Sequence, residues 1–313
     1  MNQSLSKSIV ATIAYYDVFD YPLTSFEIWK YLIVQNQSLG LYPEPAEPIR
    51  LEDVVKALET ESVRRHIGHL NGSYFLQGRR VLAERRLKRG KLAIAKLHGV
   101  RKLVFWLRFV PFVRMVALTG SLAMKNSEAS GDWDLLIVLR SGHIWTGRAL
   151  LTGLLQLFGK RRHGEDVADR ACLNYWITTD SLEIITKDLF SSNEYFFITP
   201  LFGFEEFRKF QEKNQWIRRF RPQYHVMESA HMLCARDFWL AKVVRDIGEI
   251  LLSDRALERK LSVMQKKKIA ANPKTKLSGS LIEATNKALI FLPKPQGPKV
   301  FEQFKQRLSE VEA

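Results

Sequence analysis

The first 80 residues carry three helical patterns followed by a hairpin signal. Apolar residues recur at helical spacing up to Asp17, and a second helical stretch begins near Thr24, a residue that can cap a helix. A third helix is predicted over about 51–58. The dipeptide Asn71–Gly72, between short apolar runs, indicates a tight hairpin turn. Three helices and a hairpin are the element order of a winged helix-turn-helix, so we predict a winged-helix-like unit over 1–80.

Residues 81–110 are rich in lysine and arginine and indicate one or two helices, with Gly90 or Gly99 as the breaks. After them, β-branched runs alternate with a helical pattern. This alternation indicates a mixed α/β layer, which we assign together with the basic helices to a core over 81–204. The predicted elements are a strand within 113–121, a strand within 132–140, a helix over about 145–158 and a strand within 172–179.

From about Glu205 onward the pattern is mostly helical. Apolar residues recur at spacings of three and four between 226 and 252, and a basic tail leads into a last helix. We therefore predict a helical C-terminal domain with a basic tail over 205–313. The expected fold class is α/β (α+β), with a small mixed sheet in a core that lies between a winged-helix-like unit and a helical domain.

Composition narrows the class of protein. The chain has 313 residues, 46% hydrophobic and 26% charged, which is ordinary for a globular protein and excludes a disordered or fibrous chain. No run approaches the roughly 18 apolar residues of a membrane span, since Arg108 and Pro111 interrupt the best candidate. Cys172 and Cys234 are too few for a disulfide framework or a zinc site. We expect a soluble, cytoplasmic protein with reduced thiols and no membrane partner.

The net charge of +15 is concentrated in two segments. Residues 79–114 hold twelve basic side chains against one acid, and residues 255–313 hold thirteen against five. Clustered basic residues indicate a polyanionic partner, either a nucleic acid or a nucleotide phosphate. A solvated helix face is the simpler explanation for any single lysine- and arginine-rich helix.

The predicted winged-helix-like unit has two possible uses. Such a unit can place a helix in the major groove of DNA, or it can serve as a protein contact or a domain cap. Its third helix and the residues around it carry four acids against one lysine, and acidic side chains repel phosphate. The charge pattern therefore argues against DNA reading by this unit. The residues concerned are Glu52, Asp53, Glu59, Glu61 and Lys56.

The most informative stretch is 116–138, where one strand ends at Gly120–Ser121 and the next opens with Asp132 and Asp134. Glycine lets a backbone approach a ligand closely, and a helix start offers free N–H groups to phosphate. Asp132 and Asp134 are two residues apart on a strand, so both side chains point to one face. Adjacent carboxylates need a cation, and Mg²⁺ suits them when phosphate supplies further oxygens. This arrangement fits nucleotidyl transfer.

In these residues the chain resembles the DNA polymerase β-like nucleotidyltransferase superfamily, whose motif is an apolar residue, Gly, Gly or Ser, a gap, and Asp–apolar–Asp/Glu. Leu118, Gly120–Ser121, ten intervening residues and Asp132–Trp133–Asp134–Leu135 fit it, and Thr119 is a small departure. The resemblance covers about 105–200. With its order of units, the chain also looks like a group of poorly characterised bacterial nucleotidyltransferase-domain proteins. The resemblance implies an NTP held by Gly120 and Ser121, and Mg²⁺ held by Asp132 and Asp134.

The family usually has a third carboxylate on a neighbouring strand, where it deprotonates the attacking hydroxyl. The matching strand here has Asn174 at its inward position, and an amide cannot act as a base. Asp180 and Glu183 lie beyond the end of that strand. Either one of them reaches the site, with Asp180 as the catalytic candidate, or the site is a two-carboxylate or binding-only version.

The predicted activity is Mg²⁺-dependent transfer of NMP from an NTP to an acceptor hydroxyl, with release of pyrophosphate. Lys125 and Ser127 are further candidates to touch the triphosphate, with ordinary surface positions as the alternative. The basic segments would steer a polyanionic acceptor such as RNA. The rival is a catalytically inactive nucleic-acid-binding or regulatory protein with a relic transferase core, which Asn174 favours. Transfer to a small molecule or a protein stays open as a third possibility.

Overall fold

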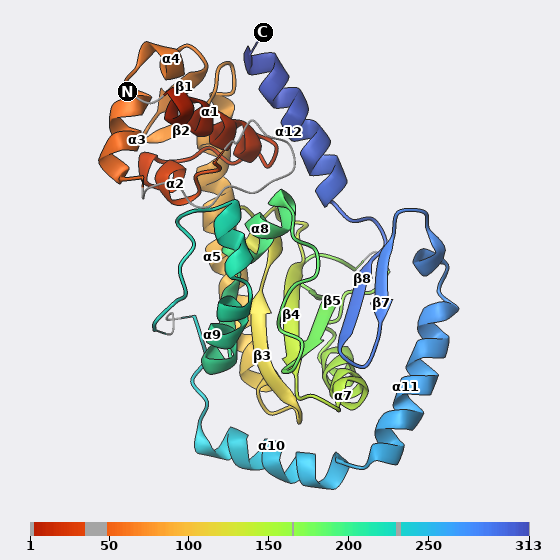
Figure 1. The fold of residues 1–313 in the computed structure, drawn as a ribbon. Helices are drawn as coiled ribbons and strands as arrows, with labels where there is room; N and C mark the ends of the chain where they lie inside the picture. Colours follow the sequence, from red (N-terminus) through yellow and green to blue (C-terminus); the bar gives the residue numbers. More distant parts are fainter. Residues whose placement is uncertain (1–2, 35–48, 165, 230–232, 313) are drawn as a thin grey trace.

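The computed structural model describes residues 3–34, 49–164, 166–229 and 233–312. It is a mixed α/β protein with a small N-terminal unit, a central sheet with helices on both faces, and a C-terminal segment that runs around the sheet (Figure 1). Both termini lie beside the N-terminal unit, at the end of the molecule opposite α10 (Trp239–Leu252). The α+β fold class predicted from the sequence is confirmed at this level.

The N-terminal unit contains the predicted helices and the predicted hairpin. Thr24 caps the second helix in a capping box with Glu27, and Leu23 pairs with Tyr74 beside the hairpin. A short helix before the hairpin was not predicted. The elements are α1 (Gln3–Asp17), α2 (Ser25–Lys30), α3 (Leu51–Leu58), α4 (Glu61–Arg64), β1 (Ile67–Leu70) and β2 (Ser73–Leu76).

The basic segment forms one helix, α5 (Val81–Leu107), which is one of the two predicted alternatives, and neither Gly90 nor Gly99 breaks it. Packing on the sheet outweighs the modest helix-weakening effect of each glycine. Glycine at position 99 also avoids a close contact, because a Cβ there would lie 3.2 Å from the Trp133 ring. The helix can therefore lie close against the strand that carries the aspartates.

The central sheet has the strand order β6-β3-β4-β5-β8-β7. The neighbours β4 and β5 are parallel and are joined through α7 (Ile144–Leu157), and the other neighbouring pairs are antiparallel. This mixture agrees with the predicted small mixed sheet. The strands are β3 (Val113–Leu118), β4 (Trp133–Leu139), β5 (Ala171–Thr178), β6 (Thr199–Phe202), β7 (Leu281–Ala284) and β8 (Ala288–Leu292).

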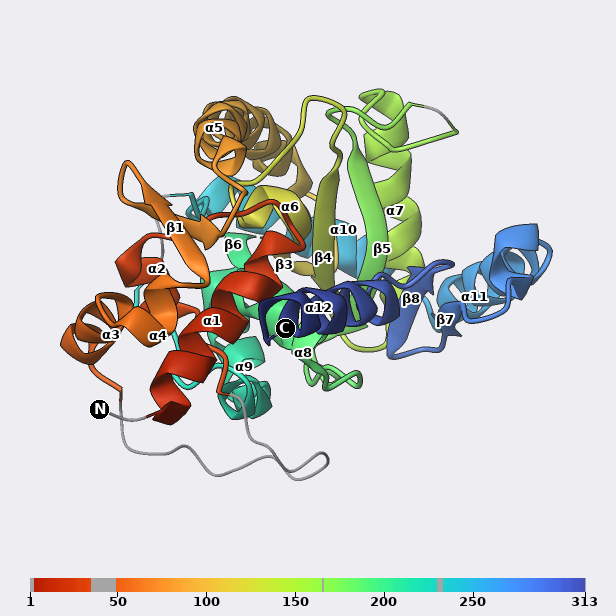
Figure 2. The same ribbon diagram turned by 90° about the horizontal axis from the view of Figure 1, so that it is seen from above.

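Alternate residues of the central strands enter two separate cores, as the period of two in a strand requires. Leu135 and Ile137 pack with α5 and α7 on one face, and Leu136 and Val138 pack with α8 (Leu189–Phe196) and α9 (Phe204–Lys213) on the other. Figure 2 shows these two pairs of helices on opposite sides of the sheet. Buried on both faces, these strands form a firm base for side chains at their ends.

The C-terminal part is not a separate helical domain, and this expectation was wrong. The hairpin β7–β8 pairs with β5 and completes the central sheet. Of the helix expected within 226–252, only α10 is helical among the described residues. Nonlocal strand pairing and the termination of a helix by tertiary contacts are not visible in local periodicity. The remaining elements are α6 (Gly120–Ala123), α11 (Arg255–Ala270), α12 (Gly297–Glu312) and the 3₁₀ turns Gln215–Arg219 and Pro273–Lys276.

The last helix returns to the N-terminal unit. Arg307 on α12 forms an ion pair with the buried Asp17 at 3.0 Å, and Phe304 meets the ring of Tyr15 edge-on. Among the residues that the structure describes, none of the helices combines the length and the apolar character that crossing a bilayer requires.

Glu249 fastens α10 to the sheet. It accepts hydrogen bonds from Arg114 at 2.7 and 2.8 Å, from Arg140 at 3.0 Å and from the Phe112 N–H at 2.9 Å. Burial alone would raise the pKa of Glu249, but the Arg114 bonds, the Phe112 N–H and Arg140 together lower it to about 2.

We expect Glu249→Gln to weaken the docking of α10 by about 2 kcal/mol at pH 7. Because the folded-state pKa is depressed, the contribution of the carboxylate is present above its usual pKa and is lost as pH falls toward 2. Native-state hydrogen exchange of the α10 amides at pH 7 measures the opening free energy. Asp246→Asn, an exposed acid on the same helix, is the control, and an equal loss in both variants would contradict the assignment.

Candidate functional site

The two motif aspartates lie together at the beginning of β4, a central strand of the sheet. Asp134 is the second residue of β4, and Asp132 directly precedes that strand, while Trp133 between them is buried in the core. On the neighbouring strand β5, Cys172 pairs with Asp134. Potential ligand atoms of Asp132, Asp134 and Cys172 all lie within 4.8 Å of one another. The pairing of side chains predicted from their two-residue spacing is therefore present.

Gly120 lies against one of these carboxylates, that of Asp134. It follows β3, and its φ of 68° lies in the left-handed region that favours glycine. The neighbouring Thr119 N–H donates to the Asp134 carbonyl at 2.9 Å, which holds the turn against β4. A Cβ at Gly120 would overlap Asp134 Oδ2. Both the backbone conformation and the close approach therefore require glycine.

A third carboxylate is present, and it comes from α8. Glu194 accepts a hydrogen bond from the Gly120 N–H, and the Thr119 side chain also bonds to it. Burial raises the pKa of Glu194 despite these bonds. The sequence analysis gave Glu194 no role in the site. The sequence pattern around Asn193 and Glu194 was interpreted as helix capping. The cap of α8 is in fact Asp188, whose side chain accepts from the Ser191 N–H at 2.6 Å.

The crowding of acids changes their proton affinity. Burial first, and then the charges of Asp132 and Glu194, raise the pKa of Asp134 to about 7. Burial first, and then the charges of Asp134 and Asp132, raise the pKa of Cys172 to about 12, so this residue is a neutral thiol at physiological pH. Arg162 donates to Asp132 Oδ2 at 2.6 Å and to the Cys172 sulfur at 3.4 Å, and so partly offsets the negative charge.

These donors fit Mg²⁺. The ion prefers oxygen ligands and is commonly held by one or two carboxylates together with substrate phosphates and waters. Asp132 and Asp134 provide the two carboxylates. Burial first, and then the charge of Asp132, raise the pKa of Asp134, and a cation would offset both effects. The protonated Cys172 sulfur is a poor ligand for a hard cation.

A pocket of about 900 Å³ opens beside the carboxylates. Gly120, Ser121 and Asp134 line one part of it, and the beginning of α12 with its preceding turn lines another. The charged lining combines the cations Arg89, Lys294 and Lys299 with the acids Asp20, Glu128, Asp134, Asp188 and Glu194. The volume lies in the usual range for small-molecule sites. Lys294 and Lys299 suit an anionic ligand, whereas Arg89 is already bonded to Glu128.

Two predicted phosphate contacts are not brought to this pocket. Lys125 is exposed with a φ of 56°, and Ser127 is fully buried with its hydroxyl donating to the Glu128 carbonyl at 3.3 Å. Neither belongs to the described lining of the pocket. Lys125 is exposed at the surface, and the Ser127 hydroxyl bonds within its own turn.

Asp180 and Glu183 are not brought to the aspartates either. Because β4 and β5 are parallel, Cys172 lies beside Asp134 and Thr178 lies beside Leu139 at the opposite end. Thr178 donates to Asp180 at 2.6 Å, which places Asp180 about 20 Å along the strand from the motif. Asp180 and Glu183 line a different cavity, of about 730 Å³. Asn174 does line the motif pocket.

Comparisons of this chain with protein-family models, with curated proteins and with solved structures find no match. The functional assignment therefore depends on the chemistry of the site.

Proposed function

We propose that the protein is a Mg²⁺-dependent nucleotidyltransferase that moves NMP from an NTP to an acceptor hydroxyl and releases pyrophosphate. The observation that carries this proposal is the carboxylate pair Asp132–Asp134, of which Asp134 lies against Gly120 and lines a pocket of about 900 Å³. The motif resemblance supports the same activity. In this proposal the core is a nucleotidyltransferase core and the N-terminal unit is winged-helix-like.

Each residue has a separate task in the proposal. Asp132 and Asp134 hold Mg²⁺, which when bound neutralises phosphate charge and stabilises the departing pyrophosphate. Gly120 and Ser121 leave the wall free of a bulky side chain, so that a triphosphate can lie close to the backbone. Lys294 and Lys299 face the same pocket and attract the phosphates.

The class of acceptor is inferred from the net charge of the chain and from its distribution. A net charge of +15, with all of the excess in 79–114 and 255–313, supports a polyanionic acceptor such as RNA. Two observations favour the inactive alternative, a nucleic-acid-binding or regulatory protein with a relic core. Arg162 already neutralises Asp132, and Asn174 rather than an acid lines the pocket from β5. In that case the pocket would bind no nucleotide through Mg²⁺.

Calorimetric titration with each of the four NTPs, with and without Mg²⁺, tests the proposal. We expect at least one NTP to bind only with Mg²⁺, and we expect the double variant Asp132→Asn, Asp134→Asn to weaken that binding by about 100-fold. The matched control is Asp180→Asn, Glu183→Gln, which also removes two negative charges, but from the lining of the other cavity. Absence of binding for all four NTPs, or equal binding by both double variants, would refute the nucleotide site.

A further inference from the structure

The helix α10 buries charged side chains and exposes apolar ones. Its charged residues Arg245 and Glu249 are buried against the body of the protein, whereas its large apolar residues face solvent. Trp239 is 75% exposed, Ile250 is 78% exposed and Leu251 is 74% exposed. The same outward face includes Leu240, Val243, Val244 and Ile247. Figure 1 shows α10 along one end of the molecule. A contiguous apolar face of this kind marks an interaction surface.

The contacts on the inner side fix this orientation. Arg245 donates to the Arg108 carbonyl at 2.7 Å and forms an ion pair with Asp237, and Glu249 is held by Arg114 and Arg140. Rolling the helix to bury its apolar face would break these pairs and leave charges without partners, which is strongly unfavourable. The contacts of Arg245 and Glu249 therefore keep the apolar face of α10 toward solvent. None of the described residues covers that face.

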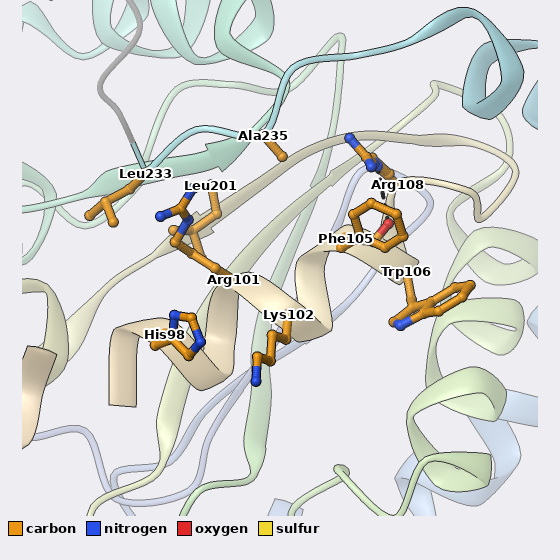
Figure 3. Close-up of a pocket in the computed structure, with 9 residues that line it drawn as sticks. All are labelled: His98, Arg101, Lys102, Phe105, Trp106, Arg108, Leu201, Leu233 and Ala235. Atoms are coloured by element: carbon orange, nitrogen blue, oxygen red, sulfur yellow. Dashed lines mark hydrogen bonds between the residues drawn. The ribbon is translucent and has the colours of Figure 1, made fainter. Parts of the chain in front are cut away.

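A cationic and aromatic hollow lies at the start of α10. A cavity of about 570 Å³ is lined by His98, Arg101 and Lys102 together with Phe105 and Trp106, all from α5, and Figure 3 shows these side chains around it. No acidic residue is found in its described lining. The hollow adjoins α10 through one ring, since Phe109 contacts both Trp106 and Phe238, the residue before α10.

The other end of α10 is also followed by cations. After a two-residue turn, α11 presents exposed basic side chains mixed with the exposed apolar residues Val263 and Met264. Its exposed cations are Arg255, Arg259, Lys260, Lys266, Lys267 and Lys268. An apolar stripe with a tryptophan, flanked by arginine and lysine, is the composition of a helix that lies in a membrane interface.

We propose that α10 docks on an anionic lipid surface, with its apolar face in the interface and with the α5 hollow and α11 against lipid phosphates. The attachment is peripheral, and it departs from the sequence-based expectation of no membrane partner. It does not depend on the proposed transferase activity, and it assigns the cations of the α5 hollow and of α11 to lipid phosphates rather than to a polyanionic acceptor.

Charge and area favour a lipid surface over other occupants. A second copy would bring another chain of net charge +15 to the same face. A helix about 21 Å long also offers much less than the roughly 800 Å² per partner of a stable protein interface. Nucleic acid does not suit the stripe, because aliphatic side chains do not stack on bases. Anionic lipid matches both the apolar stripe and the flanking cations.

Vesicle cosedimentation of the full chain tests this proposal. We expect binding to phosphatidylcholine vesicles that contain about 30% phosphatidylglycerol, weaker binding to pure phosphatidylcholine, and weakening by salt. Ile247→Glu, Ile250→Glu should lower the partition coefficient by about 10-fold or more. Both positions are exposed, so the fold is expected to persist, which a thermal melt verifies. Ile185→Glu, at an exposed isoleucine outside the surface, is the control and should bind like the wild type.

Several results would overturn the lipid assignment. One is the absence of binding to anionic vesicles. Another is equal binding by the α10 variant and the Ile185→Glu control. A third is a wild-type dimer that Ile247→Glu, Ile250→Glu converts to a monomer without any vesicle binding, because that result would assign the face to a second copy. Loss of NTP binding in the calorimetric experiment would leave this proposal unaffected, since α10 and the motif pocket share no described residue.

Discussion

Asp134→Asn is expected to lower the rate of pyrophosphate release from the bound NTP by about 1,000-fold, whereas Asp180→Asn leaves it unchanged. Asp134 shares the carboxylate pair with Asp132 and faces Gly120. Asparagine keeps the shape of the side chain but removes the negative charge that holds the metal. Asp180 bonds to Thr178 at the far end of β5, about 20 Å away along the strand, where it cannot act on a phosphate in the motif pocket.

The comparison is made at saturating NTP and Mg²⁺ with coupled detection of pyrophosphate, first with water and then with short RNAs as acceptors. Folding of both variants is checked by near-UV circular dichroism, which reports the packing of the aromatic core. An equal loss in the two variants would mean that the activity does not come from this carboxylate pair. An active Asp134→Asn variant would favour a binding-only or relic core.

The sequence predicted those parts of the site that depend only on residues close together along the chain. Gly120–Ser121 and the alternation Asp132–Trp133–Asp134 depend on neighbours along the chain, because a strand turns successive side chains to opposite faces. The structure has these residues where that rule places them, with Trp133 buried and the aspartates together. The same local rules account for the Thr24 cap and the Asn71–Gly72 hairpin turn, both of which are present.

The parts that were missed depend on distant segments. Glu194 reaches Gly120 from 74 residues further along the chain, and nothing in the residues around it distinguishes it from an ordinary helical glutamate. Cys172 joins the aspartates only through the register of β4 with β5. The hairpin β7–β8 enters the sheet beside β5 from more than 100 residues away, although local pattern suggested a helical domain there. Tertiary pairing, rather than propensity, decides each of these features.

The case of α10 shows a different limit. Its apolar residues have the three- and four-residue spacing of an amphipathic helix, and such a stripe is normally taken to face the core. The ion pairs of Arg245 and Glu249 turn that stripe outward instead. Periodicity therefore reports that one face is apolar, and only the partners of the opposite face show which way it points.

Gly120→Ala is expected to lower NTP affinity by about 100-fold in the calorimetric titration with Mg²⁺. The φ of 68° alone costs an alanine about 1 kcal/mol, and the added Cβ would overlap Asp134 Oδ2. The overlap forces either the turn or the carboxylate to move, and both are needed where phosphate and metal would meet. Displacement of a binding group by about 1 Å is enough to lose a factor of this size.

Gly153→Ala is the matched control, because this glycine lies within α7 and an added Cβ would have nothing within 4 Å. That variant should keep the wild-type affinity and gain about 0.5 to 1 kcal/mol in stability, as alanine does within a helix. Unchanged affinity in Gly120→Ala would show that nucleotide does not lie against this turn. If instead Gly120→Ala loses NTP binding while its thermal melt stays near that of the wild type, the loss comes from the site itself, because the rest of the fold is intact.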